Sequence, residues 1–199
     1  MTSFEYLAVL FSVVVGLAVA QTLRGVLRIV QHRRTMRIYW PTLVWTAAVL
    51  QWTIFFWWFS AFGLAQLEVW RLTTLLFVLA YASTLFFLLG LLHPDDAGAS
   101  FDMQAHFEDN RAWFFGVFLG LGVLDVADTL FKRATGVSSL EGRHLVEYAA
   151  FLGVWLVGAA VSLRVRDGRV LGAAGVLYFL IALYISMRSG VLGPLLGGG

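Results

Sequence analysis

The sequence contains no cysteine and a single lysine, Lys132, and each shortage excludes a kind of chemistry. Without cysteine the chain forms no disulfide bond, no thiolate metal site and no cysteine nucleophile. A retinal Schiff base requires a lysine inside the membrane, whereas Lys132 falls at the end of an apolar segment. P-loop, HExxH and GxSxG motifs are absent, and the four histidines fall at segment ends or in loops, where they do not suit haem. We therefore expect a protein that is not an enzyme and that holds no cofactor and no metal.

Charged residues are also scarce. They make up 13% of the 199 residues, against 60% hydrophobic residues, whereas soluble domains have roughly 25% charged and about 45–50% apolar residues. A soluble fold of this length has too little interior for so much apolar surface, so lipid must be the solvent. The net charge of +2 is too small to indicate a nucleic-acid partner.

Six segments have the length of about 20 mostly apolar residues that a spanning helix requires. No basic stretch precedes the first of them, so we expect a retained helix and not a signal peptide. The sequence predicts an all-α, polytopic integral membrane protein with one transmembrane domain over residues 1–199 and a flexible tail at 190–199. The predicted spans are residues 4–30, 40–62, 69–92, 112–131, 143–163 and 168–188.

The distribution of arginine and lysine predicts the orientation, because cytoplasmic loops carry an excess of these residues. The first, third and fifth loops with their flanks hold nine of them, and the opposite side holds five. We therefore expect a multi-pass protein of the bacterial inner membrane with both termini extracytoplasmic. The nine residues are Arg24, Arg28, Arg33, Arg34, Arg37, Arg111, Arg164, Arg166 and Arg169.

Two carboxylates lie inside the fourth predicted span, and ionisable groups in a span are candidates for function. Counted from Ala112 at ~1.5 Å per residue, Asp125 lies ~20 Å and Asp128 ~24 Å along the helix. They predict a cation or proton site on the extracytoplasmic side. The alternative is a structural ion pair, above all for Asp128, because Lys132 follows it by four residues.

The same side contains three further candidates. His144 and Glu147 share one face at the start of the fifth span, where they could bind a metal or relay a proton. Two residues are a weak signal for a metal, and a polar helix start at the membrane interface is the favoured explanation. Glu5 would join this acidic rim from the first span, although a carboxylate at a helix start is also favoured by the helix dipole.

Small residues recur on two predicted helices at a spacing of four, which lets helices approach closely. We expect these stripes to serve packing, within one chain or between copies, with a polar pore lining as the alternative. They are Ser12, Gly16 and Ala20 in the first helix and Gly116 and Gly120 in the fourth.

Short matches between the two halves suggest a three-plus-three inverted repeat, as in many transporters. Residues 19–23 (VAQTL) match residues 126–130 (VADTL). We expect a small homo-oligomeric channel or transporter for a cation or proton. The alternative is a non-conducting membrane protein that binds lipid or a protein partner. Its basis is the basic loop with Arg33, Arg34 and Arg37, which could contact anionic headgroups at about 1 kcal/mol per residue.

Overall fold

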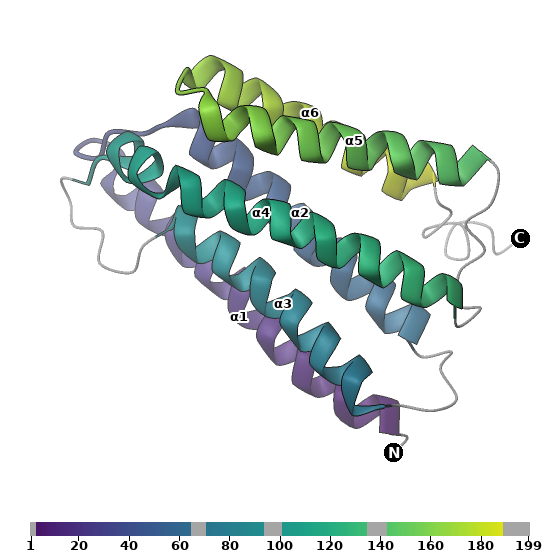
Figure 1. Cartoon of the computed structure of the whole chain (residues 1–199). Helices are drawn as coiled ribbons and strands as arrows, with labels where there is room; N and C mark the ends of the chain where they lie inside the picture. Colours follow the sequence, from purple (N-terminus) through teal and green to yellow (C-terminus); the bar gives the residue numbers. More distant parts are fainter. Residues whose placement is uncertain (1–2, 65–70, 94–100, 135–142, 189–199) are drawn as a thin grey trace, which may run out of the picture.

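The described part of the chain folds into a bundle of six α-helices, shown in Figure 1. The computed structural model describes residues 3–64, 71–93, 101–134 and 143–188, so the tail expected at 190–199 lies outside it. These described ranges contain no β-strand, only an isolated bridge between Arg37 and Asp102. The helices are α1 (Ser3–His32), α2 (Trp40–Leu64), α3 (Leu72–Leu92), α4 (Met103–Ala134), α5 (Arg143–Arg164) and α6 (Gly168–Arg188).

Five of the described helices, all except α2, are long and apolar enough to cross a membrane. The prediction of an all-helical membrane protein is thereby confirmed. α2 has 25 residues and no charged side chain, but it holds five tryptophans and Gln51, and the indole N–H makes tryptophan only weakly apolar. This helix packs against α1, α3, α4 and α6, so much of its surface faces protein.

The fourth helix is longer than its predicted span, because the polar residues 103–111 continue into it without a break. Asp102 precedes the first turn, and its Oδ1 accepts hydrogen bonds from the backbone N–H groups of Gln104 (2.8 Å) and Ala105 (3.1 Å). This is an N-cap, which satisfies donors that a helix start leaves without partners. Gln104 also donates to Glu108 one turn later, at 2.8 Å. These bonds explain why the polar turn is helical.

Aromatic rings fill the bundle between α2, α4, α5 and α6. The Trp45 ring lies 5.6, 5.1 and 5.2 Å from Phe114, Phe115 and Phe118, each in edge-on geometry. Its indole N–H donates to the carbonyl of Leu171 on α6 at 3.1 Å. Aromatic pairs of this kind add stability beyond the area they bury, and they leave the centre of the bundle densely filled.

The small-residue stripes face outward in this chain. A Cβ atom added at Gly16, Gly116 or Gly120 would meet nothing within 4 Å, so none of these glycines lets two described helices approach. Close helix packing occurs at other glycines, such as Gly175, where a Cβ would lie 2.9 Å from Val44. The glycines of the expected stripes therefore make no close helix contact among the described residues, although Ser12 accepts a hydrogen bond from the indole N–H of Trp57 on α2 at 3.0 Å. An interface between copies stays a prediction.

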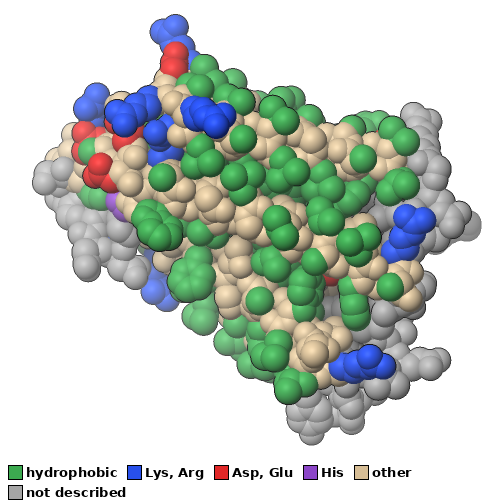
Figure 2. All heavy atoms as spheres, viewed as in Figure 1, with side chains coloured by type: hydrophobic (Ala, Val, Ile, Leu, Met, Phe, Trp, Pro, Cys, Tyr) green, Lys and Arg blue, Asp and Glu red, His purple; other side chains and the backbone are tan. Residues whose placement is uncertain are grey.

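Hydrophobic side chains are spread over the middle of the face shown in Figure 2, where no charged side chain gathers. Arginine side chains gather at the two ends of the bundle, and more of them lie at the end that carries the α1–α2 and α5–α6 connections. This is the distribution expected of a bundle whose middle lies in hydrocarbon and whose ends reach the headgroups.

Candidate functional site

α4 buries one carboxylate in the bundle. Phe118 and Leu121 precede Asp125 by seven and four residues, so the three side chains lie on one face of α4. They are 1%, 0% and 8% exposed. Because this face points toward the other helices, the charge-bearing group of Asp125 is turned away from lipid.

Tyr81 on α3 donates its phenolic proton to Asp125. The distance from its Oη to Oδ1 of Asp125 is 3.0 Å, and the indole N–H of Trp52 on α2 donates to the same Oη at 2.8 Å. An indole nitrogen can only donate, so Tyr81 must be the acceptor in that pair. Its own proton is therefore free to point at the carboxylate, and the order of the chain is Trp52, Tyr81, Asp125.

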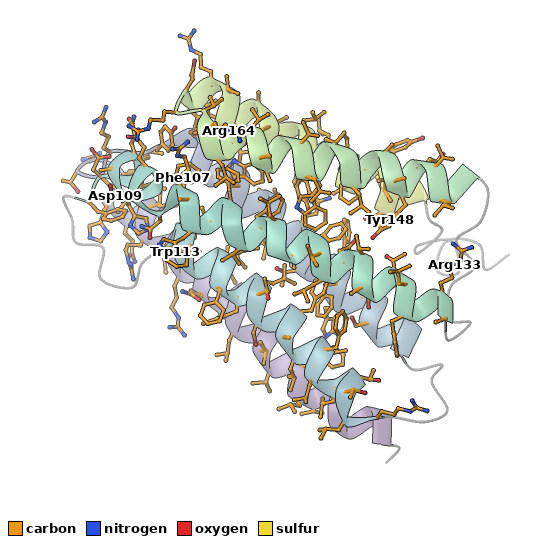
Figure 3. The ribbon with its side chains drawn as sticks, viewed as in Figure 1. Phe107, Asp109, Trp113, Arg133, Tyr148 and Arg164 are labelled. Carbon is orange, nitrogen blue, oxygen red and sulfur yellow. The ribbon has the colours of Figure 1, made fainter. Side chains whose placement is uncertain are left out.

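Tyr148 on α5 donates to the other carboxylate oxygen, Oδ2 of Asp125, at 2.7 Å. Its oxygen accepts a hydrogen bond from the hydroxyl of Thr129 at 2.9 Å. Thr129 lies one turn after Asp125 on α4, which brings both side chains to the same neighbour. Figure 3 shows Tyr148 on the side of α5 that faces α4. Side chains from four helices thus converge on one carboxylate.

A third tyrosine, Tyr178 on α6, has its ring 6.3 Å from the ring of Trp52, the residue that donates to Tyr81. Its side chain is 3% exposed, and its ring lies 5.0 Å from Phe118 and 5.3 Å from Trp155. Among the described residues its hydroxyl has no hydrogen-bond partner, and neither has the buried amide of Gln51. Leaving such a group unsatisfied costs roughly 1–3 kcal/mol, so polar groups are retained here at a cost in stability.

The structure brings together part of the predicted acidic rim. Asp128 follows Asp125 by three residues on α4, so the two carboxylates lie within one turn of each other, and Glu147 adjoins Tyr148 in the sequence. The side chains of Glu5 and His144 lie outside the described part of the chain. Within that part, no group of three or more His, Asp or Glu side chains is placed to hold a metal ion.

The sequence reasoning missed the tyrosines. In an apolar helix a tyrosine usually indicates an aromatic core residue or an interfacial anchor, so Tyr81, Tyr148 and Tyr178 carried no polar signal. Tyr148 was the one that could have been found, because it directly follows Glu147 at a polar helix start. The role of Trp52 in orienting Tyr81 depends on a contact between two helices, which no local pattern in the sequence shows.

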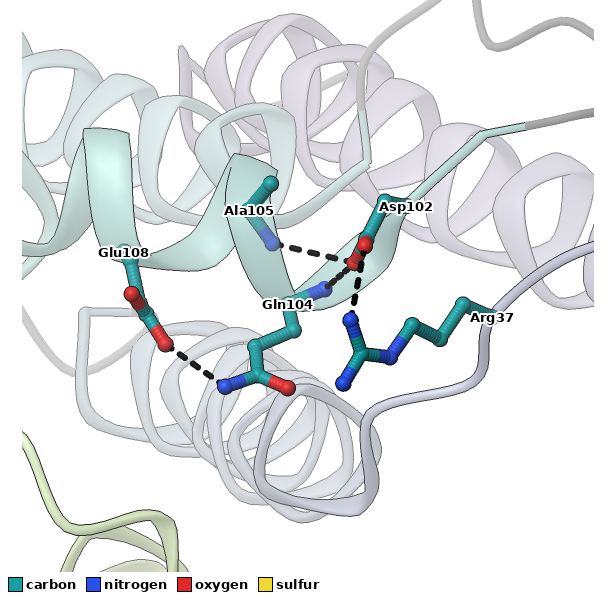
Figure 4. Close-up of polar contacts among 5 residues, drawn as sticks. All are labelled: Arg37, Asp102, Gln104, Ala105 and Glu108. Atoms are coloured by element: carbon teal, nitrogen blue, oxygen red, sulfur yellow. Dashed lines mark hydrogen bonds and ion pairs between the residues drawn. The ribbon is translucent and has the colours of Figure 1, made fainter.

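The end of the bundle with most arginines has its own polar contacts (Figure 4). Arg37 forms an ion pair with Asp102 at 3.2 Å, which ties the α1–α2 connection to the start of α4. The backbone N–H of Ala105, the N–H of Gln104 and the Arg37 guanidinium lower the pKa of Asp102. Arg33 and Arg34, predicted with Arg37 to contact lipid headgroups, are exposed.

His93 closes the same end just beyond α3. Its Nε2 lies 2.9 Å from the hydroxyl of Thr46, whose proton is donated to the carbonyl of Thr42 at 2.7 Å. His93 must therefore be the donor to Thr46, which fixes the tautomer of a neutral ring. Burial, with smaller effects from His106 and Arg28, lowers the pKa of His93 from 6.5 to about 4.

The described residues define an α-helical membrane protein with a buried carboxylate. Five of their helices are apolar and of spanning length, and tyrosines surround the ionisable group of Asp125. No family model, no curated protein and no solved structure matches the chain.

Proposed function

We propose that this protein transports protons across the membrane, with Asp125 as the group that binds and releases them. The observation that carries the proposal is the burial of this carboxylate between the hydroxyl groups of Tyr81 and Tyr148. An ionisable side chain inside a membrane bundle is costly, and such residues usually mark the pathway of an ion or proton.

The direction of the hydrogen bonds favours a proton over a metal cation. Tyr81 and Tyr148 present hydroxyl protons to Asp125, one to each oxygen. A metal cation would meet these protons and would have to displace them. A proton on Asp125 requires only that one hydroxyl turn and accept, because a tyrosine oxygen keeps acceptor capacity. The arrangement is therefore suited to alternate between a carboxylate and a carboxylic acid.

The filling of the bundle favours a transporter over a channel. Between Asp125 and the end that carries Arg37, the rings of Trp45, Phe114 and Phe118 occupy the space that a water-filled pore would need. Because packed rings do not conduct protons, passage would require the helices to move so that Asp125 meets each side in turn. Alternating access of this kind is typical of secondary transporters.

The proposal includes six spans, with α2 as the sixth, in a bacterial inner membrane and with both termini extracytoplasmic. The excess of arginine in the first, third and fifth loops supports this orientation, which puts Asp125 on the extracytoplasmic side. An inverted repeat stays a hypothesis: both α1 and α4 pack against the helix that follows them, but the backbone of α1 also lies close to that of α3, whereas among the described residues the backbones of α4 and α6 are not in close contact.

The proposal also includes a homo-oligomer. A groove of 400 Å³ lies on the outside of α1 and α2 and is lined in part by Ser12, Gly16, Ala20 and Trp57. Such a groove would admit a helix of a second copy, and small residues favour helix contacts in membranes.

Proton flux into proteoliposomes that hold a pH-sensitive dye tests the function. We expect flux under a pH gradient in the unmodified protein and none in Asp125→Asn, which keeps the size of the side chain but cannot ionise. Asp109→Asn is the matched control, because Asp109 is an exposed carboxylate of the same helix at the opposite end (Figure 3).

Equal flux in Asp125→Asn and in the unmodified protein would overturn the proposal. Absence of flux under any gradient would favour the rival function, a non-conducting protein that binds lipid or a partner through its basic end. Tyr148→Phe keeps the proposal testable if Asp125→Asn does not fold. It leaves the carboxylate in place, removes one hydroxyl donor and should shift the pH dependence of flux.

A further inference from the structure

A groove runs along the outside of the bundle between α5 and α6. Its volume is 250 Å³, and the buried rings of Trp45, Phe118 and Trp155 lie among its lining. Val157 on α5 and Leu177 on α6 also line it and are 63% and 51% exposed. Because its rims are exposed and its floor is buried, this α5–α6 groove opens sideways, toward the hydrocarbon of the membrane.

Arginines surround one end of the α5–α6 groove. Arg164 follows Val157 by seven residues, so it lies on the same face of α5 and about 10 Å further along the helix. Arg166 and Arg169 follow in the α5–α6 connection and the first turn of α6, and all three side chains are exposed. Figure 3 places Arg164 at this end of α5. The acid of this segment, Asp167, accepts the backbone N–H of Arg169 at 2.8 Å.

The distances match the dimensions of one leaflet. Half of the hydrocarbon core is about 15 Å thick. With Arg164 at the headgroups, the groove residues on α5, from Val154 to Ala159, lie roughly 8–15 Å deeper. That depth is where the acyl chains of the same leaflet lie. The arginines at the groove end therefore lie at the level of a phospholipid headgroup, and the apolar lining lies at the level of its acyl chains.

We propose that the α5–α6 groove binds one anionic phospholipid, with its phosphate at Arg164, Arg166 and Arg169 and an acyl chain in the groove. The guanidinium fork matches phosphate oxygens in pairs, which favours arginine for this contact. The volume of 250 Å³ is below the roughly 300–1,000 Å³ of sites for drug-sized ligands, so it suits a slender chain better than a fused ring system.

Two glycines of α5 allow a matched test of the chain contact. Gly158 lines the groove and Gly153 does not, and a Cβ added at either would meet nothing within 4 Å. We expect Gly158→Leu to fill the groove and to weaken binding of phosphatidylglycerol about tenfold, because several methylene groups of the acyl chain can no longer be buried there. Gly153→Leu should bind as the unmodified protein does. Bound lipid is counted by native mass spectrometry of detergent-purified protein.

The charge contact is tested by Arg164→Gln and Arg166→Gln, with Arg133→Gln at the opposite end of the bundle as control (Figure 3). Each of the first two changes should weaken phosphatidylglycerol binding about fivefold and leave phosphatidylcholine binding unchanged. Because these side chains are exposed, the variants should fold even if Gly158→Leu does not.

Three results would overturn the proposal. Phosphatidylcholine could bind as tightly as phosphatidylglycerol, which would remove the phosphate contact as a basis for selection. Inorganic phosphate alone could protect the protein from thermal unfolding in a manner that depends on Arg164 while the lipid does not, which would make this a free-phosphate site. Gly158→Leu could convert an oligomer to a monomer, which would show that a second copy covers the groove.

Discussion

The imidazole of His93 lies directly on the backbone of α1 at Gly25. A Cβ atom at position 25 would come within 2.5 Å of Cγ of His93 and 2.7 Å of Nδ1. The absence of a side chain on α1 therefore lets the end of α3 and its buried histidine pack against this helix.

Gly25→Ala should destabilise the protein by about 1–3 kcal/mol, because a buried ring must move to admit the methyl group. Thermal or denaturant unfolding in detergent measures the change. Gly153→Ala is the control: it is also a helical glycine, but its added Cβ has open space. Equal stability of the two variants would contradict the close approach of His93.

Tyr148→Phe should lower the stability by roughly 1–3 kcal/mol, because Oδ2 of Asp125 loses the hydroxyl that donates to it at 2.7 Å. In a double-mutant cycle with Asp125→Asn the two effects should not add, since Tyr148→Phe removes the donor of this bond and Asp125→Asn removes the charge of its acceptor. Additive effects would mean that this hydrogen bond contributes nothing to stability.

The stability should also depend on pH through His93. Its pKa is lowered from 6.5 to about 4. Between these two pH values the imidazole is protonated in the unfolded chain but neutral in the folded protein. The neutral His93 therefore contributes fully to the free energy of unfolding above pH 6.5. This contribution, up to about 3 kcal/mol, is lost as the pH falls toward about 4. Unfolding measured across this range should show that slope, and His93→Gln should flatten it. An unchanged slope in His93→Gln would assign the dependence to other groups.

Reporter fusions test the orientation. A reporter after Gly199 should read as extracytoplasmic and one inserted near Gly98 as cytoplasmic, because the arginine excess lies in the first, third and fifth loops. The reverse pattern would move Asp125 to the cytoplasmic side of the membrane.

Gly16→Leu tests the oligomer. The substitution fills part of the groove on α1 and α2, and it starts from open space, because a Cβ there meets nothing within 4 Å. Native mass measurement should show an oligomer for the unmodified protein and a smaller species for Gly16→Leu. A species of 22.1 kDa for both would contradict the assembly.

The helices were predictable because their signals are local. The length of an apolar run indicates a spanning helix, and residues such as Pro41 and Gly168 mark where the helix starts. Asp125 was predictable as a candidate because a carboxylate in such a run stands out. The sequence did not predict which face of each helix packs against another helix. The spacing of four at Gly16 defines a stripe of small residues, but it does not say what that stripe contacts. The tyrosines around Asp125 come from three other helices, and no local pattern joins them.

The contact between α2 and α6 also sets an order on biogenesis. Trp45 leaves the ribosome early, yet the carbonyl to which its indole donates belongs to Leu171, 126 residues later. α4 supplies the rings of Phe114, Phe115 and Phe118 earlier, but until α6 is inserted the part of α2 that α6 covers has only lipid or the insertion machinery beside it. A chain arrested before α6 would therefore display an unfinished aromatic surface in the membrane, and quality-control proteases that survey the bilayer would find their target there.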